Sequence, residues 1–573
     1  MTTSFVQEIS QFLSQKTKKD PSFFVPFIEK PPSLEMGDYS FICFPLAKEL
    51  KKNPKDLAQE LAQAFPPSPH FDKVISTGPY LNFFVNQKFY QTEIIQDIVN
   101  KKELYGSSHE ETPKTIVLEY SSPNIAKPFH IGHFRATIIG NSLKKIFEML
   151  GHTCIGINYL GDWGTQFGKL ICAFKKWGDV KDLKDDPIQY LHSLYVRFHS
   201  EAKSNPSLEE EAREWFKKCE KKDPEALKLW KEFKELSLKE FKLIYDDLHV
   251  QFDEVSGESH YDEFIPKTIS EIQASLKTQI SEGALIIDLE KFGMPPALLL
   301  RSDGASLYLT RDIAALFDRH NRLHFDKIIY VVGDTQTLHF KQLFKIIELM
   351  GKPWVKNCHH IAFGQIRFKD QKMSTREGKA IWLEDMLHRS TELISKIIEE
   401  KNPTLKDKKE VAQKVGLGAI IFADFSSKRI KNSVFDWDVI LNPDGDTGPY
   451  VLYTYARASS ILRKACHPEK KACHPEQSEG SLIPLESPEE RMLIGHLERF
   501  PHIIASAAHD FEPCYIANYL LDLAKLFNRF YHEHRVIQEN PDLQSARLKL
   551  VTATRQVMST GLSLLGIEPP EEL

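Results

Sequence analysis

Two histidines, His130 and His133, and a nearby lysine, Lys127, are the residues whose types and spacing best suit chemistry in this chain of 573 residues. Each imidazole can donate a hydrogen bond to a phosphate oxygen. Gly132 stands between the histidines, and a flat base could approach the backbone there because glycine has no side chain. The pattern therefore predicts a site for a phosphate-bearing nucleotide. Isolated histidines would more often be ordinary residues at a helix start, so the neighbouring residues must show whether these two bind a ligand.

A short strand, a stiff loop and a helix must position these residues. The apolar, β-branched run 116–118 predicts a buried parallel strand. Pro123 and Pro128 exclude regular structure from the loop, because each lacks an N–H group and restricts the residue before it. Apolar residues recur at helical spacing beyond Gly132, which predicts a helix. The loop is therefore expected at the carboxyl end of a strand and beside the positive end of a helix dipole, where open α/β sheets bind ligands.

This stretch resembles the HIGH signature of class I aminoacyl-tRNA synthetases. His130-Ile-Gly-His133 matches the signature, and Glu119-Tyr-Ser-Ser-Pro-Asn-Ile-Ala-Lys127 is similar to the arginyl-tRNA synthetase branch. The resemblance implies ATP-dependent ligation of L-arginine to its cognate tRNA through an arginyl adenylate, with ATP and Mg²⁺ and with release of AMP and pyrophosphate. It implies that His130, Gly132 and His133 bind ATP, and that Lys127, His130 and His133 are catalytic.

A second stretch, Lys-Met-Ser-Thr-Arg at 372–376, resembles the KMSKS signature, whose basic groups close over the pyrophosphate in this class. The resemblance implies ATP binding by Lys372, Met373 and Ser374, and catalytic roles for Lys372 and Arg376. The chain departs from the signature at Thr375, where a second lysine is expected. Arg376, Lys379 or Lys127 could supply the missing charge, and the sequence leaves that choice open. Taken alone, the stretch could be an exposed basic turn.

The resemblance also implies a pocket for the arginine side chain. A guanidinium favours planar carboxylate partners, and Glu119 and Asp312 would supply them at strand-end positions of one crevice. By resemblance, the family's arginine-binding positions are matched by Glu119, Asn124, Tyr308, Asp312 and Gln336. Such a pocket rejects isosteres that lack the charge, so no editing domain is expected. Alternatively, Glu119 and Asp312 merely cap helices.

Strands that alternate with helices predict an α/β fold, with a Rossmann-like, doubly wound parallel sheet as the catalytic domain over 113–385. Charged helices over about 177–250 look too polar for a core and predict an insertion that stands off the sheet. Residues 1–112 predict an α+β module, and 386–573 predict an all-α helical bundle without strands. The stretch 161–164, Gly-Asp-Trp-Gly, follows a strand and is expected to face a ligand.

By resemblance, both flanking domains bind tRNA, the first at the outer corner of the molecule and the second at the anticodon. The implied tRNA-binding residues are Asp38, Tyr80, Asn82 and Phe83 in the first domain and Tyr450, Tyr453 and Arg457 in the second. Phe83 and Phe84 alternate in a predicted strand, so one of them must face outward. Phe83 could also belong to the core.

Composition and charge limit the class of protein. The length predicts about three or four domains, with 42% hydrophobic and 27% charged residues. A net charge of −5 argues against indiscriminate coating of nucleic acid, although a local basic face could still attract tRNA. The eight cysteines lack the Cys-x-x-Cys spacing of a zinc site, so we expect no metal site. No run approaches 18 apolar residues and no targeting segment is evident, so we expect a cytoplasmic monomer that contacts no membrane.

One segment departs from the family. Ala465-Cys-His-Pro-Glu recurs as Ala472-Cys-His-Pro-Glu. Two Cys-His pairs could suggest zinc, but adjacent ligands seldom close one tetrahedron. We expect a disordered loop inserted between two helices over about 465–486.

Two other functions fit parts of the sequence. Another class I synthetase or a related nucleotidylyltransferase would share the histidine signature, but it would not share the five arginine-pocket positions. A catalytically impaired tRNA-binding paralogue is suggested only by Thr375, whereas both histidines and Lys372 are present. Arginine-dependent exchange of pyrophosphate into ATP would separate an enzyme from a binding protein.

Overall fold

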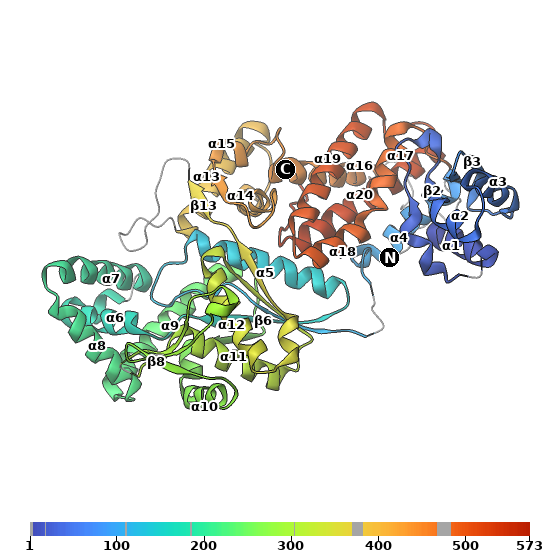
Figure 1. The fold of residues 1–573 in the computed structure, drawn as a ribbon. Coiled ribbons are helices and arrows are strands. Elements are labelled where there is room, and N and C mark those ends of the chain that lie inside the picture. The colour runs from blue at the N-terminus through green and yellow to red at the C-terminus, as the bar shows by residue number, and fades with distance from the viewer. Residues whose placement is uncertain are drawn as a thin grey trace. The chain divides into compact units, whose positions relative to one another are not determined.

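Five parallel strands form the central sheet of the protein, which we describe from a computed structural model (Figure 1). They are β5 (Thr115–Glu119), β6 (Thr153–Leu160), β7 (Glu254–Gly257), β11 (Lys327–Gly333) and β12 (Cys358–Phe363). Their order is β12-β11-β5-β6-β7, so the direction in which strands are added reverses between β5 and β11. This is the predicted Rossmann-like sheet, and folds of this kind bind ligands at the reversal point.

Helices cover both faces of the sheet. α5 (Ile131–Met149) packs on β5, β6 and β11. α11 (Tyr308–Leu323) and α12 (Thr337–Leu349) share a hydrophobic core with side chains of the same three strands, including Val117. Ile116 and Leu118, which alternate with Val117, are buried as well. Strand β5 is therefore buried on both faces, as its apolar run predicts.

The helices between β6 and β7 build a core of their own. α6 (Thr165–Trp177), α7 (Pro187–Ser204), α8 (Ser207–Glu220) and α9 (Pro224–Asp247) enclose buried side chains that include Phe198, Phe216 and Phe233. The prediction of helices was confirmed, but the prediction that they are too polar for a core was wrong. Their apolar residues recur on one stripe of each helix, and the stripes face one another.

Two small sheets were not predicted. α10 (Ile265–Ser275) is followed by a small antiparallel sheet of β8 (Gln279–Ser281), β9 (Ala284–Ile287) and β10 (Ala297–Leu300). β13 (Ile366–Phe368) pairs in parallel with β14 (Ser433–Phe435), in a region where no strand was expected. Each partner has only three residues and lies far from the other in sequence, so local periodicity could not reveal the pair.

Helices otherwise dominate the C-terminal region, as predicted. They are α13 (Leu383–Lys401), α14 (Lys408–Phe425), α15 (Trp437–Ile440), α16 (Gly448–Ala465), α17 (Pro488–Leu497), α18 (Phe500–Asp510), α19 (Cys514–Glu533) and α20 (Pro541–Leu564).

The N-terminal region is the predicted α+β module. Its antiparallel sheet has the order β1 (Ile28–Glu29), β2 (Tyr39–Ile42), β4 (Tyr80–Val85) and β3 (Phe71–Thr77), and its helices are α1 (Ser4–Thr17), α2 (Phe44–Leu50), α3 (Pro54–Ala64) and α4 (Gln87–Lys101). The module joins the helical region through Glu498, whose carboxylate accepts hydrogen bonds from the hydroxyls of Tyr39 at 2.7 Å and Tyr90 at 2.9 Å.

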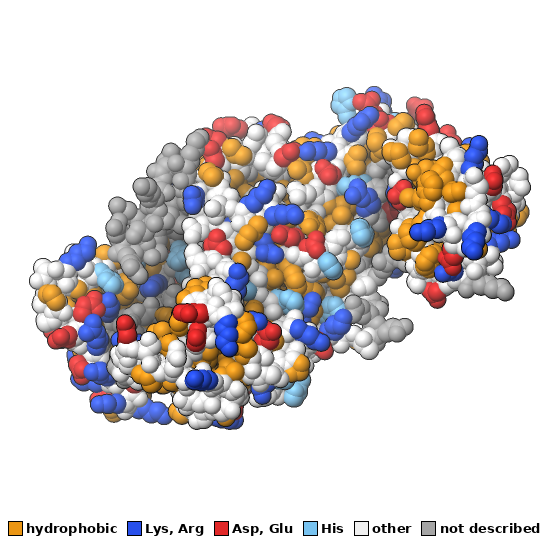
Figure 2. Space-filling view, viewed as in Figure 1, with side chains coloured by type: hydrophobic (Ala, Val, Ile, Leu, Met, Phe, Trp, Pro, Cys, Tyr) orange, Lys and Arg blue, Asp and Glu red, His pale blue; other side chains and the backbone are white. Residues whose placement is uncertain are grey.

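The chain divides into two compact units, one formed by residues 1–105, 457–502 and 523–558 and the other by 106–456, 503–522 and 559–573. On the face shown in Figure 2, acidic and basic side chains are interspersed. No helix among the described residues is both long and apolar enough to cross a membrane. The structure describes residues 4–17, 19–108, 112–183, 186–302, 304–368, 382–466 and 483–573. Lys372, Met373, Ser374, Thr375, Arg376 and Lys379 lie outside these ranges, as does nearly all of the Cys-His repeat.

Candidate active site

His130 and His133 form the cap of helix α5. The backbone N–H of Gly132 donates to Nδ1 of His130 at 3.1 Å, and the backbone N–H of His130 donates to Nδ1 of His133 at 3.4 Å. The two rings stack with centroids 3.7 Å apart. Because each Nδ1 accepts a hydrogen bond, the proton of each neutral ring lies on Nε2. Each imidazole therefore keeps one N–H donor for a ligand.

Burial keeps both imidazoles neutral. Desolvation, followed by the charge of Lys127, lowers the pKa of His130 to about 4. Burial also holds the pKa of His133 well below its usual value, with smaller contributions from His130 and Lys127. At neutral pH these rings are hydrogen-bond donors without charge. The cation of this loop is Lys127, whose Nζ lies 5.3 Å from the ring centroid of Tyr195.

The loop before the histidines has a strained backbone. Ser121, Ser122 and Ala126 adopt left-handed conformations with φ of 70°, 48° and 58°. Such conformations cost about 1–3 kcal/mol each and persist only where the surroundings impose them. Helix α9 supplies part of that support, because the N–H of Ala126 donates to Oγ of Ser237 at 2.8 Å and the hydroxyl of Tyr245 lies 2.7 Å from Oγ of Ser121. The helices predicted to stand off the sheet therefore hold its ligand loop in place.

Glu119, at the end of β5, forms a buried ion pair with Arg319 of α11. The guanidinium carbon of Arg319 also lies 5.0 Å from the ring centroid of Tyr159. Burial raises the pKa of Glu119, and the neighbouring Arg319 counteracts this shift. Glu119 was predicted to contact a bound guanidinium, but it already holds the guanidinium of its own chain. Arg319 lies seven residues after Asp312, which is two helical turns and hence the same face of α11, so the sequence did contain a signal.

Asp312 and Glu258 are two carboxylates near this ion pair that could receive a ligand, since Asp312 influences the pKa values of both Glu119 and Glu258. Oδ2 of Asp312 lies 2.7 Å from Nε2 of His339. Glu258 is buried, its Oε2 has no hydrogen-bond partner among the described residues, and its nearest cation is Nη1 of Arg311 at 3.8 Å. Burial raises the pKa of Glu258 well above its usual value, and the charge of Asp312 adds to this shift. The two carboxylates are therefore close enough to interact electrostatically.

Sequence reasoning missed Glu258. It directly follows Gly257, the last residue of β7, so it lies at the same carboxyl edge of the sheet as Glu119. The rule that ligands bind at this edge could have identified it. The hydroxyl of Tyr159 on β6 is also buried without a hydrogen-bond partner in the described part of the chain. Buried polar atoms are nearly always hydrogen-bonded, so these two point to a polar ligand.

The neutral residues predicted for the arginine pocket lie at the rim of the crevice or next to β6. Tyr308 is 58% exposed at the start of α11, and Gln336 is exposed just before α12. Oδ1 of Asn124 accepts a long hydrogen bond of 3.5 Å from Gln166. Gly161 packs so closely on Asn124 that a Cβ there would lie 2.3 Å from this oxygen. Glycine at 161 therefore lets Asn124 approach the end of β6.

Both side chains of the Gly-Asp-Trp-Gly stretch are buried, although a ligand-facing loop was predicted. Asp162 is fully buried, and its carboxylate accepts hydrogen bonds from the N–H of Ser259 at 2.8 Å and from Lys234 at 2.6 Å. Trp163 packs in the core of the helices after β6, with its ring centroid 5.5 Å from that of Trp230. The prediction rested on polar residues at the end of a strand. Their partners, Ser259, Lys234 and Trp230, lie far away in sequence, so the local pattern could not show that these side chains are buried.

Two of the tRNA contacts predicted for the N-terminal module, Asn82 and Phe83, are buried. Phe83 is 0% exposed and packs against other phenylalanines, so its side chain cannot touch tRNA. Asn82 is also buried, and it accepts a hydrogen bond from Oγ of Ser40 at 2.7 Å. Phe84 and Asp38 instead line a cavity of about 460 Å³. Strand alternation thus places Phe84, rather than Phe83, outside the core.

The other predicted tRNA-binding residues remain accessible. Tyr80 is 38% exposed on β4. On α16, Tyr450 and Tyr453 are half-buried and Arg457 is exposed. Arg457 bonds to Asn528, and its guanidinium carbon lies 5.4 Å from the ring centroid of Tyr531.

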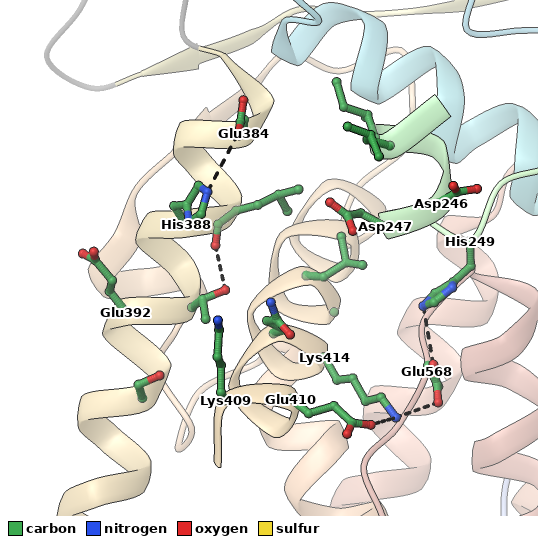
Figure 3. A pocket seen from close by; sticks show the side chains of 18 of the residues that line it. Asp246, Asp247, His249, Glu384, His388, Glu392, Lys409, Glu410, Lys414 and Glu568 are labelled. Carbon is green, nitrogen blue, oxygen red and sulfur yellow. Dashed lines mark hydrogen bonds and ion pairs between the residues drawn. The ribbon is translucent and has the colours of Figure 1, made fainter. Parts of the chain in front are cut away.

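A second cleft, of about 1240 Å³, lies between α9, α13 and α14 (Figure 3). Lys414 bridges Glu410 at 2.9 Å and Glu568 at 2.8 Å, and Nε2 of His249 lies 3.4 Å from Glu568. Its acidic lining residues are Glu240, Asp246, Asp247, Glu384, Glu392, Glu410 and Glu568. None of the predicted site residues that the structure describes lines this cleft, and its seven carboxylates outnumber its three lysines and so oppose a polyanion. We therefore do not assign the active site to it.

Comparisons with known proteins agree with this geometry. The family described as "tRNA synthetases class I (R), catalytic domain" matches residues 94–437. "Arginyl tRNA synthetase N terminal domain" matches 3–85, and "DALR anticodon binding domain" matches 451–573.

Relatives match over the full length. A protein of Alkaliphilus metalliredigens named arginine--tRNA ligase is 46% identical over 572 residues, which is 100% of both chains. A protein of Clostridium perfringens with the same name is 47% identical over 547 residues, 95% of this chain and 96% of the relative. The solved structure of Thermus thermophilus arginyl-tRNA synthetase is 26% identical and superposes with a TM-score of 0.81 over 100% of both chains.

The parallel sheet, with a His-Ile-Gly-His loop at the point where its strand order reverses, defines the catalytic region of a class I aminoacyl-tRNA synthetase. Within this class, the chain belongs to the arginyl-tRNA synthetase family.

Proposed function

We propose that this protein ligates L-arginine to its cognate tRNA, with ATP as the second substrate. The observation that carries the proposal is the pair of carboxylates, Asp312 and Glu258, which lie close enough to the buried Tyr159 hydroxyl to raise its pKa, at the carboxyl edge of the sheet. The histidine loop begins at the end of β5 in the same crevice. One crevice can therefore receive a guanidinium and a triphosphate.

At the arginine end, the proposal is that Asp312 and Glu258 receive the guanidinium. A guanidinium carries five N–H donors and no acceptor, so it suits carboxylates and a hydroxyl that lack donors. Leaving such a buried group unpaired costs about 1–3 kcal/mol, which a bound guanidinium would recover. Glu119 contributes indirectly by holding Arg319 beside the pocket. Asn124, Tyr308 and Gln336 supply the neutral contacts.

At the ATP end, the proposal is that Nε2–H of His130 and of His133 donate to phosphate oxygens, and that adenine lies against Gly132. Lys127 supplies positive charge for the pyrophosphate, because the two rings are neutral. Lys372, Met373, Ser374 and Arg376 are proposed to bind the same phosphates on the basis of the sequence alone.

The reaction needs positioning and charge stabilisation more than covalent help. In the first step, a carboxylate oxygen of arginine attacks the α-phosphorus of ATP, and the bond to pyrophosphate breaks. In the second step, a hydroxyl of the terminal ribose of tRNA attacks the carbonyl carbon of the adenylate, and AMP leaves.

Mg²⁺ is proposed to arrive with ATP. Across the described ranges, no group of three or more His, Cys, Asp or Glu side chains could hold a metal ion. The basis of the proposal is that Mg²⁺ keeps several of its waters and often binds through substrate phosphates. We assign no step to it. We further propose that the protein acts as a monomer in the cytoplasm, with tRNA bound by the N-terminal module and the C-terminal helices.

The test is exchange of labelled pyrophosphate into ATP, measured with L-arginine and with citrulline, each with and without tRNA. Citrulline has nearly the same shape but no charge, so the pocket should reject it by orders of magnitude. Absence of exchange in every condition would favour a tRNA-binding protein without activity. Equal exchange with both amino acids would contradict a charge-reading pocket.

A further inference from the structure

Arg135 is a buried arginine that the proposed substrate contacts do not use. It lies on α5, two residues after His133, and it is 1% exposed. Its Nη1 donates to the carbonyl oxygen of Gly364 at 2.5 Å and to that of Lys431 at 3.1 Å. Its Nε lies 2.8 Å from Oδ1 of Asp424, near the end of α14. One side chain on the histidine helix thus holds three separate segments.

The two carbonyls lie where the chain enters the β13–β14 pair. Gly364 comes two residues before β13, and Lys431 comes two residues before β14. The segments are packed closely here, because a Cβ on Gly364 would lie 2.7 Å from the carbonyl oxygen of Lys431. The N–H of Ser433 also donates to the carbonyl oxygen of Gln365 at 3.1 Å. Arg135 therefore fixes the start of this strand pair against α5.

Asp424 completes the arrangement. Both side chains of the pair are buried, with Asp424 3% and Arg135 1% exposed. Burial raises the pKa of Asp424, and Arg135 lowers it again. Removing one partner of a buried pair leaves an uncompensated charge, whereas exchanging both for apolar residues is often tolerated. The pair and its carbonyl contacts can therefore be tested separately.

We propose that Arg135 is a positioning residue for the nucleotide half of the reaction: it anchors α5, and with it His133 two residues earlier, to the starts of β13 and β14 and to the end of α14. This inference rests on the proposed function. Nη1 of Arg135 bonds to both carbonyls while Nε forms an ion pair with the carboxylate, and the single ammonium of lysine cannot divide these contacts in the same geometry. The arginine pocket at Asp312 and Glu258 makes none of these contacts.

The test compares Arg135→Lys with the wild-type protein in arginine-dependent pyrophosphate exchange at saturating tRNA. Misplacement by about 1 Å can cost a factor of about 100, so we expect kcat/KM for ATP to fall about 10- to 100-fold. The KM for arginine should stay within about twofold, since no pocket contact changes. A merely structural role would shift both substrates alike.

Arg547→Lys is the matched control, because Arg547 is a buried arginine that bonds to a glutamate and to a carbonyl far from the sheet in sequence. It should lower the unfolding temperature without changing the KM for ATP. If Arg135→Lys does not fold, Arg135→Met/Asp424→Leu removes both charges and should show the same ATP-specific loss.

The outcomes separate the two claims. A wild-type protein without exchange refutes the proposed function, and the inference that rests on it. An active wild-type protein overturns the positioning role alone if Arg135→Lys changes both KM values equally, or changes neither kcat nor the KM for ATP.

Discussion

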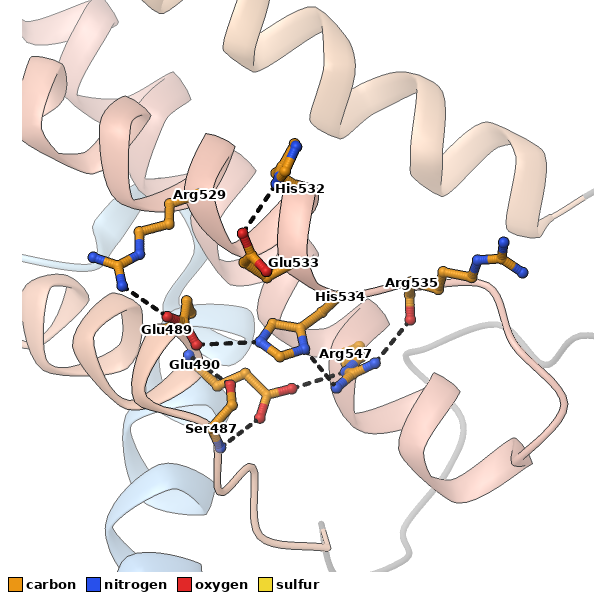
Figure 4. Close-up of polar contacts among 9 residues, drawn as sticks. All are labelled: Ser487, Glu489, Glu490, Arg529, His532, Glu533, His534, Arg535 and Arg547. Atoms are coloured by element: carbon orange, nitrogen blue, oxygen red, sulfur yellow. Dashed lines mark hydrogen bonds and ion pairs between the residues drawn. The ribbon is translucent and has the colours of Figure 1, made fainter.

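Two buried arginines, Arg547 in the C-terminal helices and Arg319 beside the central sheet, pair with buried glutamates but differ in how completely their donors are used. Nε of Arg547 donates to Glu490 at 2.8 Å, and its Nη1 donates to the carbonyl oxygen of Arg535 at 2.9 Å (Figure 4). Its Nη2 lies 3.4 Å from Nδ1 of His534. Arg319 bonds to Glu119 through Nη1, while its Nε and Nη2 have no partner in the described part of the chain.

The difference separates a structural cluster from a binding crevice. Around Arg547, each guanidinium nitrogen has a partner and Glu490 also completes the capping box of α17 with Ser487. Around Arg319, the Tyr159 hydroxyl and Oε2 of Glu258 remain buried and unpaired in the described structure. Burial without a partner is unfavourable, so such atoms are candidates for contacts with a ligand. Nε of Arg491 on α17 is also unpaired in the described structure, so the candidate arginine site is distinguished by its place at the carboxyl edge of the sheet as well as by incomplete pairing.

The largest expected effect on substrate binding comes from Asp312→Asn. It removes a charge that we propose to face the guanidinium, so arginine binding should weaken by about 2–5 kcal/mol, whereas the KM for ATP should change little. Steady-state exchange kinetics measure both values. Asp318→Asn, on the same helix, is the control and should leave the KM for arginine unchanged. Equal losses for arginine and ATP would show that Asp312 is not part of a side-chain pocket.

The second effect concerns stability beside the sheet. Arg319→Met leaves Glu119 buried without its cation, which should destabilise the protein by about 3–5 kcal/mol. The double variant Glu119→Gln/Arg319→Met should recover part of this loss, because no buried charge remains. Denaturant midpoints compare the three proteins. A double variant less stable than Arg319→Met would mean that the pair is not electrostatically coupled.

Glu490→Gln is the corresponding change in the satisfied cluster. It weakens one charge-assisted hydrogen bond, so we expect a loss of about 1.5–3 kcal/mol in stability and an unchanged KM for arginine. Thermal unfolding and exchange kinetics provide the two readouts. A raised KM for arginine would remove the distinction between the cluster and the crevice.

The smallest effect, within the pH range of ordinary assays, comes from the histidines. The pKa of His130 is lowered to about 4, so the unfolded chain binds a proton below about pH 6.5 that the folded chain does not. Stability should therefore be constant above about pH 6.5 and fall as the pH decreases from there toward 4. His130→Asn should flatten this dependence in unfolding experiments. An unchanged slope in the variant would show that His130 is not buried as a neutral ring.

Much of the architecture was predictable because it follows from short sequence patterns within single helices, strands and loops. The β-branched run became β5, the two prolines kept the following loop irregular, and the apolar spacing after Gly132 became α5. The helical periodicity also predicted that helices dominate the C-terminal region. The short strands β13 and β14 were not predicted, because three residues are too few to show a periodic pattern of buried side chains.

The sequence by itself determined the elements, the histidine loop and the strand-end position of Glu119. Only the tertiary structure decided the partners: Arg319, 200 positions away, for Glu119, and Gly364 and Asp424 for Arg135. The physical reason is the distance along the chain over which each signal acts. Side-chain periodicity within one element indicates which of its faces is buried. The residues that this face contacts depend on how elements distant in sequence pack together.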